Sequence, residues 1–510
     1  MTSTPEAEAH NRRAQKLWEE GQFEEAIQAW REANALEPDH LDALMNLAWA
    51  LSRLGRVAEA LPLAERAVRL APGDWHARHA LGHVHYEAAR YAEAAGEYSA
   101  AIDAGGEGAL LQCDLGDALY SEGEFAGAAQ AYAAALAEHP DDAYIHLWLG
   151  WSLQQIGERT RSPAGAQAEA AEHFERALSL APDWPEALYA VGQGLTAGGE
   201  FERARRFLER ALQSYPEEDE EGRAAAACEL ANALRGLGGL ERAVALYHDA
   251  LALDPTHPTA RFNLGLTYTD IEDYENAIAQ FDIVVHLDPD DADARLEKAG
   301  ACMGLGRHDD AVAEYLAALE AQPDFAEVHA GLGLAYHMMG LHDLSVEQYQ
   351  HAVRLAPDDP WSHYNLALAC DAGGRYADAD AYFEHALALG SSEAELCASV
   401  ARAITAHGRD AEAAVGAARL AVAADPEDAN AQDALAMALY SSGRYEEALR
   451  PAQGAGRLAP QVPEYSYDLG LVEESNGDTD RARQSYQRAL ELAPEFEEAR
   501  EALRRLGEDV

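Results

Sequence analysis

Residues 258–291 read PTARFNLGLTYTDIEDYENAIAQFDIVVHLDPDD. Leu264 and Tyr268 lie four residues apart, as do Ala277 and Phe281, and this spacing places each pair on one face of a helix. Pro289 marks the end of the second helix, because proline has no N–H to donate within one. The stretch therefore predicts two short amphipathic helices, helix A followed by helix B.

The same pattern returns every 34 residues. Prolines in matching positions stand at Pro255, Pro289, Pro323 and Pro357. Fourteen such units fit the chain, and they begin at residues 7, 41, 75, 109, 143, 185, 224, 258, 292, 326, 360, 394, 429 and 463. The sequence therefore predicts one repeat array, where a length of 510 residues would otherwise indicate about three domains.

Residue size is more constant than residue identity within a unit. With each unit numbered from 1 to 34, position 8 is Ala or Gly in all fourteen and position 20 is Ala in thirteen. Position 24 is usually aromatic, as at Tyr132 and Phe281. Small residues are needed where helices cross closely, and the ring fills the space between helical layers. Glycines near position 15, such as Gly306 and Gly374, predict the end of helix A.

The motif Leu264-Gly265-x-x-Tyr268, followed by Ala277-x-x-x-Phe281 and Pro289, resembles the tetratricopeptide repeat family. The resemblance spans residues 7–496. It implies an all-α fold, a right-handed α-solenoid of stacked helix-turn-helix repeats, with the A helices lining a concave groove. A last helix from Glu497 to Leu506 is expected to cap the array.

The predicted organisation has five segments. Residues 1–6 form a disordered N-terminus, 7–218 hold units 1–6 with an insertion at 158–165, 219–223 form an acidic joint, 224–496 hold units 7–14, and 497–510 form the capping helix and tail. The insertion, which carries two arginines, is interpreted either as a tolerated surface loop or as a loop that contacts a partner.

The chain is strongly acidic, with 90 Asp and Glu against 38 Lys and Arg and a formal net charge of −52. Such a surface repels phosphate groups, which argues against nucleic acids and anionic membranes as partners. No stretch approaches 18 consecutive apolar residues, and residues 1–13 lack the apolar segment of a signal peptide. Since the five cysteines are too scattered for a disulfide framework, we expect a cytoplasmic protein.

The resemblance places positions 2, 5, 9, 12 and 13 of each helix A on the concave groove, and we call this surface the A-helix face. Large aromatic and apolar residues are frequent there, as at recognition surfaces, although packing against neighbouring repeats would also explain them. Met338 is one of them, and the candidate partner-binding residues are Trp49, His76, His79, His83, Tyr86, Tyr120, Tyr144, Leu147, Trp151, Tyr189, Phe262, Leu266, Leu334, Trp361, Tyr364, Tyr440 and Tyr467.

A histidine-rich helix in unit 3 supports a metal-binding alternative. His79 and His83 lie one helical turn apart, and Cys113 and Asp117 occupy the same positions of the next helix A. Imidazole, thiolate and carboxylate groups are zinc ligands, so the four residues form a candidate metal site. Polar contacts of the histidines with a partner are the other interpretation.

The sequence contains no phosphate-binding glycine loop, no zinc-protease motif and no nucleophile motif, and the repeats leave no segment for a catalytic domain. We therefore expect no enzyme and no cofactor. The leading hypothesis is a scaffold that binds peptide or helical segments with apolar anchors and basic flanks. The alternatives are a metal-binding or metal-sensing protein and a self-assembling repeat protein.

Overall fold

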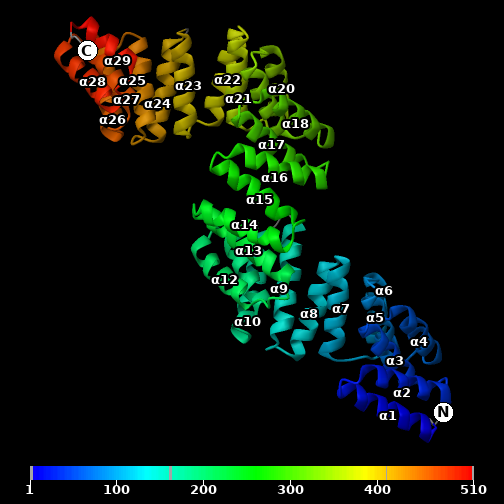
Figure 1. The fold of residues 1–510 in the computed structure, drawn as a ribbon. Coiled ribbons are helices and arrows are strands. Elements are labelled where there is room, and N and C mark those ends of the chain that lie inside the picture. Colours follow the sequence, from blue (N-terminus) through cyan, green and yellow to red (C-terminus); the bar gives the residue numbers. More distant parts are fainter. Residues whose placement is uncertain (1–3, 160–162, 409, 508–510) are drawn as a thin grey trace. The chain divides into compact units, whose positions relative to one another are not determined.

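The computed structural model describes residues 4–159, 163–408 and 410–507, which fold into helices joined by short turns (Figure 1). This described part contains 29 helices and no strand. They belong to two compact units, Met1–Ala260 and Arg261–Val510, with the boundary inside α15 (Pro258–Asp270). The predicted all-α fold of stacked helix-turn-helix repeats is confirmed.

In the first unit each odd-numbered helix is a helix A and pairs with the even-numbered helix B that follows it. Neighbouring hairpins pack side by side, so that α7 contacts α6 as well as α8. The helices are α1 Pro5–Glu19, α2 Phe23–Leu36, α3 Leu41–Arg53, α4 Val57–Leu70, α5 Trp75–Glu87, α6 Tyr91–Asp103, α7 Ala109–Glu122, α8 Phe125–Glu138, α9 Ala143–Arg159, α10 Pro163–Leu180, α11 Pro185–Ala197, α12 Phe201–Ser214, α13 Glu220–Gly236 and α14 Leu240–Leu253.

The second unit repeats this hairpin arrangement and ends with α29, the predicted capping helix, which packs on α28 through its buried Ala502 and Leu503. The helices after α15 are α16 Tyr274–Leu287, α17 Ala292–Gly304, α18 His308–Ala321, α19 Ala326–Met338, α20 His342–Leu355, α21 Pro360–Ala372, α22 Tyr376–Leu389, α23 Ala394–His407, α24 Ala411–Ala424, α25 Ala429–Ser441, α26 Tyr445–Leu458, α27 Pro463–Ser475, α28 Thr479–Leu492 and α29 Glu497–Arg505. Throughout the described residues, each helix is too short or too polar to cross a membrane.

Helix A and helix B of a repeat meet where position 8 faces position 24. A Cβ atom added to Gly265 would lie 2.6 Å from the ring of Phe281, and one added to Gly116 would lie 2.7 Å from the ring of Tyr132. Both rings are fully buried. Glycine at position 8 thus allows the helix backbone to rest directly on the ring, which explains the size pattern of the repeat.

The turns after helix A use glycine in the left-handed region. Gly306 has a φ of +68° and Gly374 a φ of +75°, a conformation that other residues rarely adopt. The predicted ends of these two helices are therefore confirmed.

Three segments are more helical than the sequence suggested. Pro5 begins α1, so residues 5 and 6 are ordered, because proline and early acidic residues suit the first turn of a helix. The acidic run at 219–223 caps and begins α13, where the side chain of Asp219 accepts a hydrogen bond from the Gly222 N–H at 2.8 Å. The insertion lengthens α9 to Arg159 and starts α10 at Pro163, while residues 160–162 lie outside the described residues.

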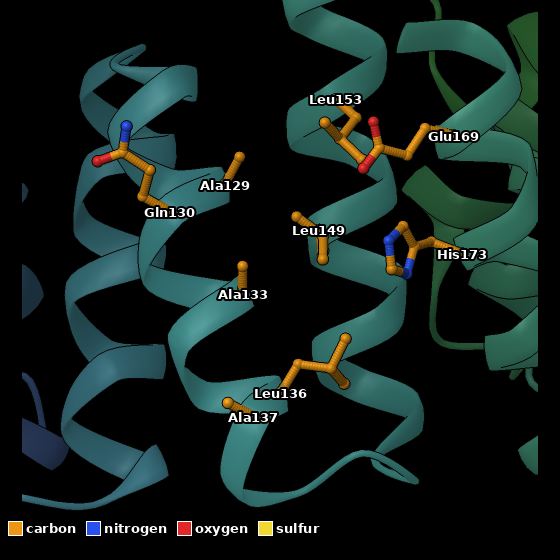
Figure 2. A pocket seen from close by; sticks show the side chains of 9 residues that line it. All are labelled: Ala129, Gln130, Ala133, Leu136, Ala137, Leu149, Leu153, Glu169 and His173. Carbon is orange, nitrogen blue, oxygen red and sulfur yellow. The ribbon is translucent and has the colours of Figure 1, made fainter. Parts of the chain in front are cut away.

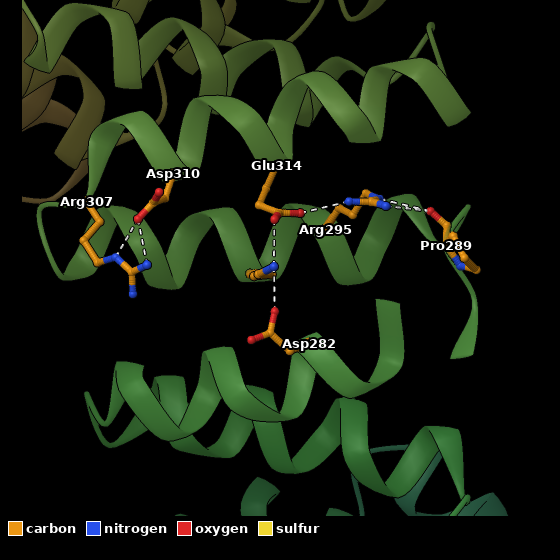
Figure 3. Close-up of polar contacts among 7 residues, drawn as sticks. Asp282, Pro289, Arg295, Arg307, Asp310 and Glu314 are labelled. Carbon is orange, nitrogen blue, oxygen red and sulfur yellow. Dashed lines mark hydrogen bonds and ion pairs between the residues drawn. The ribbon is translucent and has the colours of Figure 1, made fainter. Parts of the chain in front are cut away.

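A half-buried lysine joins two neighbouring repeats of the second unit, and its carboxylate partners Asp282 and Glu314 are labelled in Figure 3. Lys298 on α17 places its Nζ 2.6 Å from Asp282 of α16 and 2.7 Å from Glu314 of α18. Arg295 also contacts Glu314, at 3.0 Å. The same view contains an ordinary surface pair, Arg307 with Asp310, whose side chains are both more than half exposed. The lysine therefore connects three helices through two partly desolvated ion pairs. Arg307 forms an ion pair only with Asp310, three residues further along the chain.

We expect Gly265→Ala to destabilise the second unit by about 1–3 kcal/mol, since the added methyl group would overlap the Phe281 ring. Gly300, inside α17, is the matched control, because an added Cβ would meet nothing within 4 Å. Gly300→Ala should stabilise the chain by about 0.5–1 kcal/mol through helix propensity. Urea unfolding followed by circular dichroism measures both. A neutral or stabilising effect of Gly265→Ala would contradict the close contact.

We expect Lys298→Met to destabilise the second unit by about 1–3 kcal/mol, because the half-buried carboxylate of Glu314 loses one of its two cationic partners. Arg307→Met is the control and should leave the urea midpoint near that of the unmodified chain, since exposed ion pairs contribute little. Equal effects of the two substitutions would show that the lysine does not join the repeats.

Candidate functional site

The A-helix face of the first unit carries large side chains that the core does not absorb. Trp49 is 37% exposed and Tyr144 is 39% exposed, and His76 is also exposed. The other candidates on this unit are half-buried, namely His79, His83, Tyr86, Tyr120, Trp151 and Tyr189. Aromatic side chains at position 24 of helix B are instead almost fully buried, as Tyr98 and Tyr132 are. Large side chains on the A-helix face therefore have different surroundings from those at position 24 of helix B.

The A-helix face of the second unit also carries large side chains that are partly accessible. Leu334 and Met338, one turn apart on α19, are 45% and 59% exposed. The half-buried candidates here are Phe262, Leu266, Trp361, Tyr364, Tyr440 and Tyr467. Several pack edge-on or tilted against a neighbouring ring, as Trp361 does on Tyr364 with ring centroids 5.6 Å apart. These contacts orient the side chains and leave part of each accessible.

Leu147 was predicted to line the groove, and this is wrong. Its side chain is 1% exposed and packs with Phe174 of α10 and Ala187 of α11. The lengthened α9–α10 hairpin places this position against the next repeat, where a leucine fills the core. Trp148, which the position pattern missed, lies on the accessible side of α9 with its ring centroid 5.1 Å from that of Tyr120. The spacing of four residues from Tyr144 could have indicated it.

A hollow of about 430 Å³ lies among α5, α7, α8 and α9 of the first unit. Aromatic side chains line most of it, and Asp117 supplies a carboxylate. Asp117 Oδ1 accepts hydrogen bonds from the hydroxyl of Tyr132 at 2.5 Å and from that of Tyr144 at 3.0 Å. Burial raises the pKa of Asp117 above its ordinary value, and these two hydrogen bonds act in the opposite direction. The carboxylate is thus fixed in place by tyrosines.

The four metal candidates do not converge. His79 Nε2 lies 2.5 Å from Asp114, while His83 Nδ1 lies 3.2 Å from the hydroxyl of Ser52. Asp117 is engaged by its tyrosines, and burial raises the pKa of the Cys113 thiol to about 12, which disfavours the thiolate that binds metals. Among the described residues, no group of three or more His, Cys, Asp and Glu side chains is placed to hold a metal ion. The geometry gives the metal alternative no support.

A second hollow, of about 500 Å³, lies on the helix B side of the first unit (Figure 2). Alanines of α8, including Ala133, face Leu149 and Leu153 of α9 across it. His173 of α10 stands at its border and lies 2.8 Å from His146, measured between their Nδ1 atoms. The hollow is open and mostly apolar, so it offers few groups that would select a ligand.

Two carboxyl groups share a hydrogen bond near the end of the second unit. Asp433 lies on α25 and Asp468 on α27, and burial raises the pKa of both, that of Asp468 to about 8. Arg402 favours ionisation of Asp433, whereas Glu464 disfavours ionisation of both groups. Since two buried carboxylates repel each other, the pair holds one proton between them.

This shared proton makes stability depend on pH. The folded chain keeps the proton after the unfolded chain has lost it. The contribution of this pair to the free energy of unfolding is therefore fully present below about pH 4 and is lost as the pH rises to about 8. We expect Asp468→Asn to remove this loss, which is on the order of a few kcal/mol, because the amide needs no proton. Asp358→Asn at an exposed site is the control. Urea midpoints measured from pH 5 to pH 9 test this, and parallel pH curves for the unmodified chain and Asp468→Asn would contradict it.

Comparisons with known proteins agree with the repeat. A family model described as tetratricopeptide repeat matches residues 11–75, 79–143, 113–158, 167–219, 228–292, 267–324, 303–360 and 434–495. A second model with the same description matches residues 362–395. No curated protein matches the chain.

Similar solved structures overlap the chain only loosely. The MamA protein is 25% identical, covering 35% of this chain and 96% of its own, with a TM-score of 0.32. The Cut9–Hcn1 heterotetramer of the APC/C is 14% identical over 99% of this chain and 97% of its own, with a TM-score of 0.38. Naa15/Naa10 bound to HypK-THB is 15% identical over 98% and 96%, with a TM-score of 0.39. The family-model matches extend over most of the sequence, and the chain belongs to the tetratricopeptide repeat family.

Proposed function

We propose that this protein is a non-catalytic scaffold that binds peptide or helical segments of partner proteins on the A-helix faces of its repeats. The observation that carries the proposal is the contrast in burial between the A-helix face and position 24 of helix B. Tyr132 and Phe281 on helix B are fully buried, whereas Trp49, Tyr144 and Met338 on helix A keep more than a third of their surface exposed. Large side chains that a fold leaves exposed along one face are typical of binding surfaces.

The chemistry of these side chains indicates the kind of segment that would bind. Tryptophan and tyrosine offer wide contact area with few rotatable bonds, so they favour apolar anchors on the partner. The formal net charge of −52 favours basic residues beside those anchors and should make association faster at low salt. We therefore expect a segment with apolar anchors and basic flanks.

The proposal of a non-catalytic role rests on how the chain is used. Helical hairpins take up nearly all of the described residues, and both units repeat the same hairpin. In the hollow, the carboxylate of Asp117 is held by hydrogen bonds from Tyr132 and Tyr144. A scaffold needs only this repeated surface.

The test begins with peptides selected from a random display library on the immobilised full-length chain. Each peptide carries a photo-crosslinker, and mass spectrometry identifies the residues that it labels. We expect labels on the A-helix face, at positions 2, 5, 9, 12 and 13 of the repeats. Labels confined to B helices, or the failure of every peptide to bind, would overturn the proposal.

Substitutions give a second measurement. We expect the triple variant Trp49→Ala, Leu334→Ala and Met338→Ala to lower the affinity of peptides that crosslink near these residues at least about tenfold, or 1.4 kcal/mol. The matched control replaces three exposed helix B side chains, Leu316→Ala, Leu344→Ala and Tyr376→Ala, and should change affinity less than about twofold. Fluorescence anisotropy measures binding, and equal losses in the two variants would contradict the assigned face.

Light scattering addresses self-assembly. The unmodified chain is compared with the triple variant of Trp49, Leu334 and Met338. If only the unmodified chain forms a concentration-dependent oligomer, the segment that binds the A-helix face comes from a second copy of the chain. If the chain remains monomeric while peptides bind, the partner is another protein.

A further inference from the structure

The hollow of about 430 Å³ in the first unit has the composition of a cation receptor. We call it the aromatic pocket, and its defining residues are Tyr86, Asp117, Tyr120, Phe125, Tyr144 and Trp148. They come from α5, α7, α8 and α9, so the pocket crosses three successive repeats (Figure 1). It combines several ring surfaces with the carboxylate of Asp117, and Glu122 adds a second carboxylate to the lining.

The rings are held in fixed mutual positions. The centroid of Trp148 lies 5.1 Å from that of Tyr120, with the two planes at 75°, and 6.0 Å from that of Tyr144. Tyr120 in turn lies 5.2 Å from Phe125. Rings set at steep angles around a space can offer it both faces and edges, and a ring face attracts a cation within about 6 Å.

Asp117 adds a negative charge that is already oriented. Tyr132 donates to its Oδ1, and the Tyr144 hydroxyl lies 3.0 Å from Oδ1 and 2.9 Å from Oδ2. Two carboxylate oxygens together offer about four acceptor positions, so two tyrosine donors leave capacity for another. The tyrosines also prevent the side chain from turning away, which lowers the cost of ordering it when a ligand arrives.

Phe125, one of the lining residues, already stacks with a guanidinium from the chain itself. Arg159, at the end of α9, places its Cζ 4.4 Å from the centroid of the Phe125 ring. Its Nη1 donates to the carbonyl of Gly123 at 3.0 Å. Phe125 and Gly123 both belong to the lining of the hollow. Arg159 itself is not a lining residue, so its contact shows that a guanidinium stacks on the Phe125 ring and leaves the hollow open to another cation.

Other ligand classes suit the pocket less well. An anion would meet Asp117 and a strongly acidic chain, and a neutral apolar group would bury the carboxylate without a new partner, which is costly. A lysine ammonium is compact and strongly hydrated, whereas a guanidinium is planar, stacks on rings and can donate two hydrogen bonds to one carboxylate. We propose that the aromatic pocket binds the guanidinium of an arginine from a partner segment, with its N–H groups donating to the Asp117 carboxylate and its plane against the accessible faces of the Tyr120, Tyr144 and Trp148 rings.

This inference builds on the proposed function, because the arginine is assigned to the basic flank of a bound segment. Its test is nevertheless independent of the apolar anchors. The probes are acetylated and amidated pentapeptides Gly-Ser-X-Ser-Gly, in which X is arginine, citrulline, lysine or trimethyl-lysine. Citrulline has the shape of arginine without its charge. Calorimetry and tryptophan fluorescence of the full-length chain measure binding up to about 10 mM peptide.

We expect the arginine peptide to bind at least about tenfold more tightly than the citrulline and lysine peptides. Asp117→Asn and Trp148→Leu should each weaken the arginine peptide at least about tenfold. Asp117→Asn keeps an oxygen that can accept from Tyr132, so it preserves the local fold. Asp358→Asn and Trp184→Leu, which lie outside the pocket and outside the A-helix face, are the matched controls and should change binding less than about twofold. Circular dichroism verifies that each variant is folded.

Three outcomes would overturn the inference. Equal binding of arginine and citrulline peptides would show that charge is not recognised. Tightest binding of trimethyl-lysine would assign the pocket to a quaternary ammonium group instead. Absence of arginine binding, or binding that survives both pocket substitutions, would remove the site. If the arginine peptide behaves as expected while selected peptides label only B helices, the proposed function fails and the pocket remains a separate cation site.

Discussion

The close approach of helix A to helix B at position 8 is the constraint on which the rest of this structure depends. At Gly265 and Gly116 the backbone of one helix rests on an aromatic ring of the other, with no room for a methyl group. This contact uses the inner side of helix B, which is why the aromatic side chains at position 24 are buried. The opposite side of helix A takes no part in it, so large residues there remain available to other molecules.

The sequence predicted the hairpins well because each depends on contacts within 34 residues. Spacing of small and aromatic residues identified both helices and the glycine turns at Gly306 and Gly374. It could not show how neighbouring hairpins rotate against each other. Leu147 is therefore buried where the pattern expected exposure, and Trp148 faces the pocket from a position outside the expected set.

Side-chain pairing across repeats was equally beyond the sequence. The sequence placed Asp117 opposite His79, but His79 contacts Asp114 instead. Asp117 accepts hydrogen bonds from the hydroxyl groups of Tyr132 and Tyr144. The shared proton of Asp433 and Asp468 also required the arrangement of α25 and α27. Composition gives the number of acidic groups in such a chain, and only the fold determines which of them are buried, paired or directed toward a ligand.

The treatment of lysine in this fold has a practical consequence. The sequence contains two lysines, and Lys298 is locked between two carboxylates with its side chain only 16% exposed. Lys16, in the first hairpin, is 77% exposed and makes a long ion pair with Glu20. Reagents that acylate lysine side chains should therefore modify the first hairpin selectively. A fluorophore, biotin or surface linker attached in this way would leave the other repeats unobstructed for single-molecule or biosensor work.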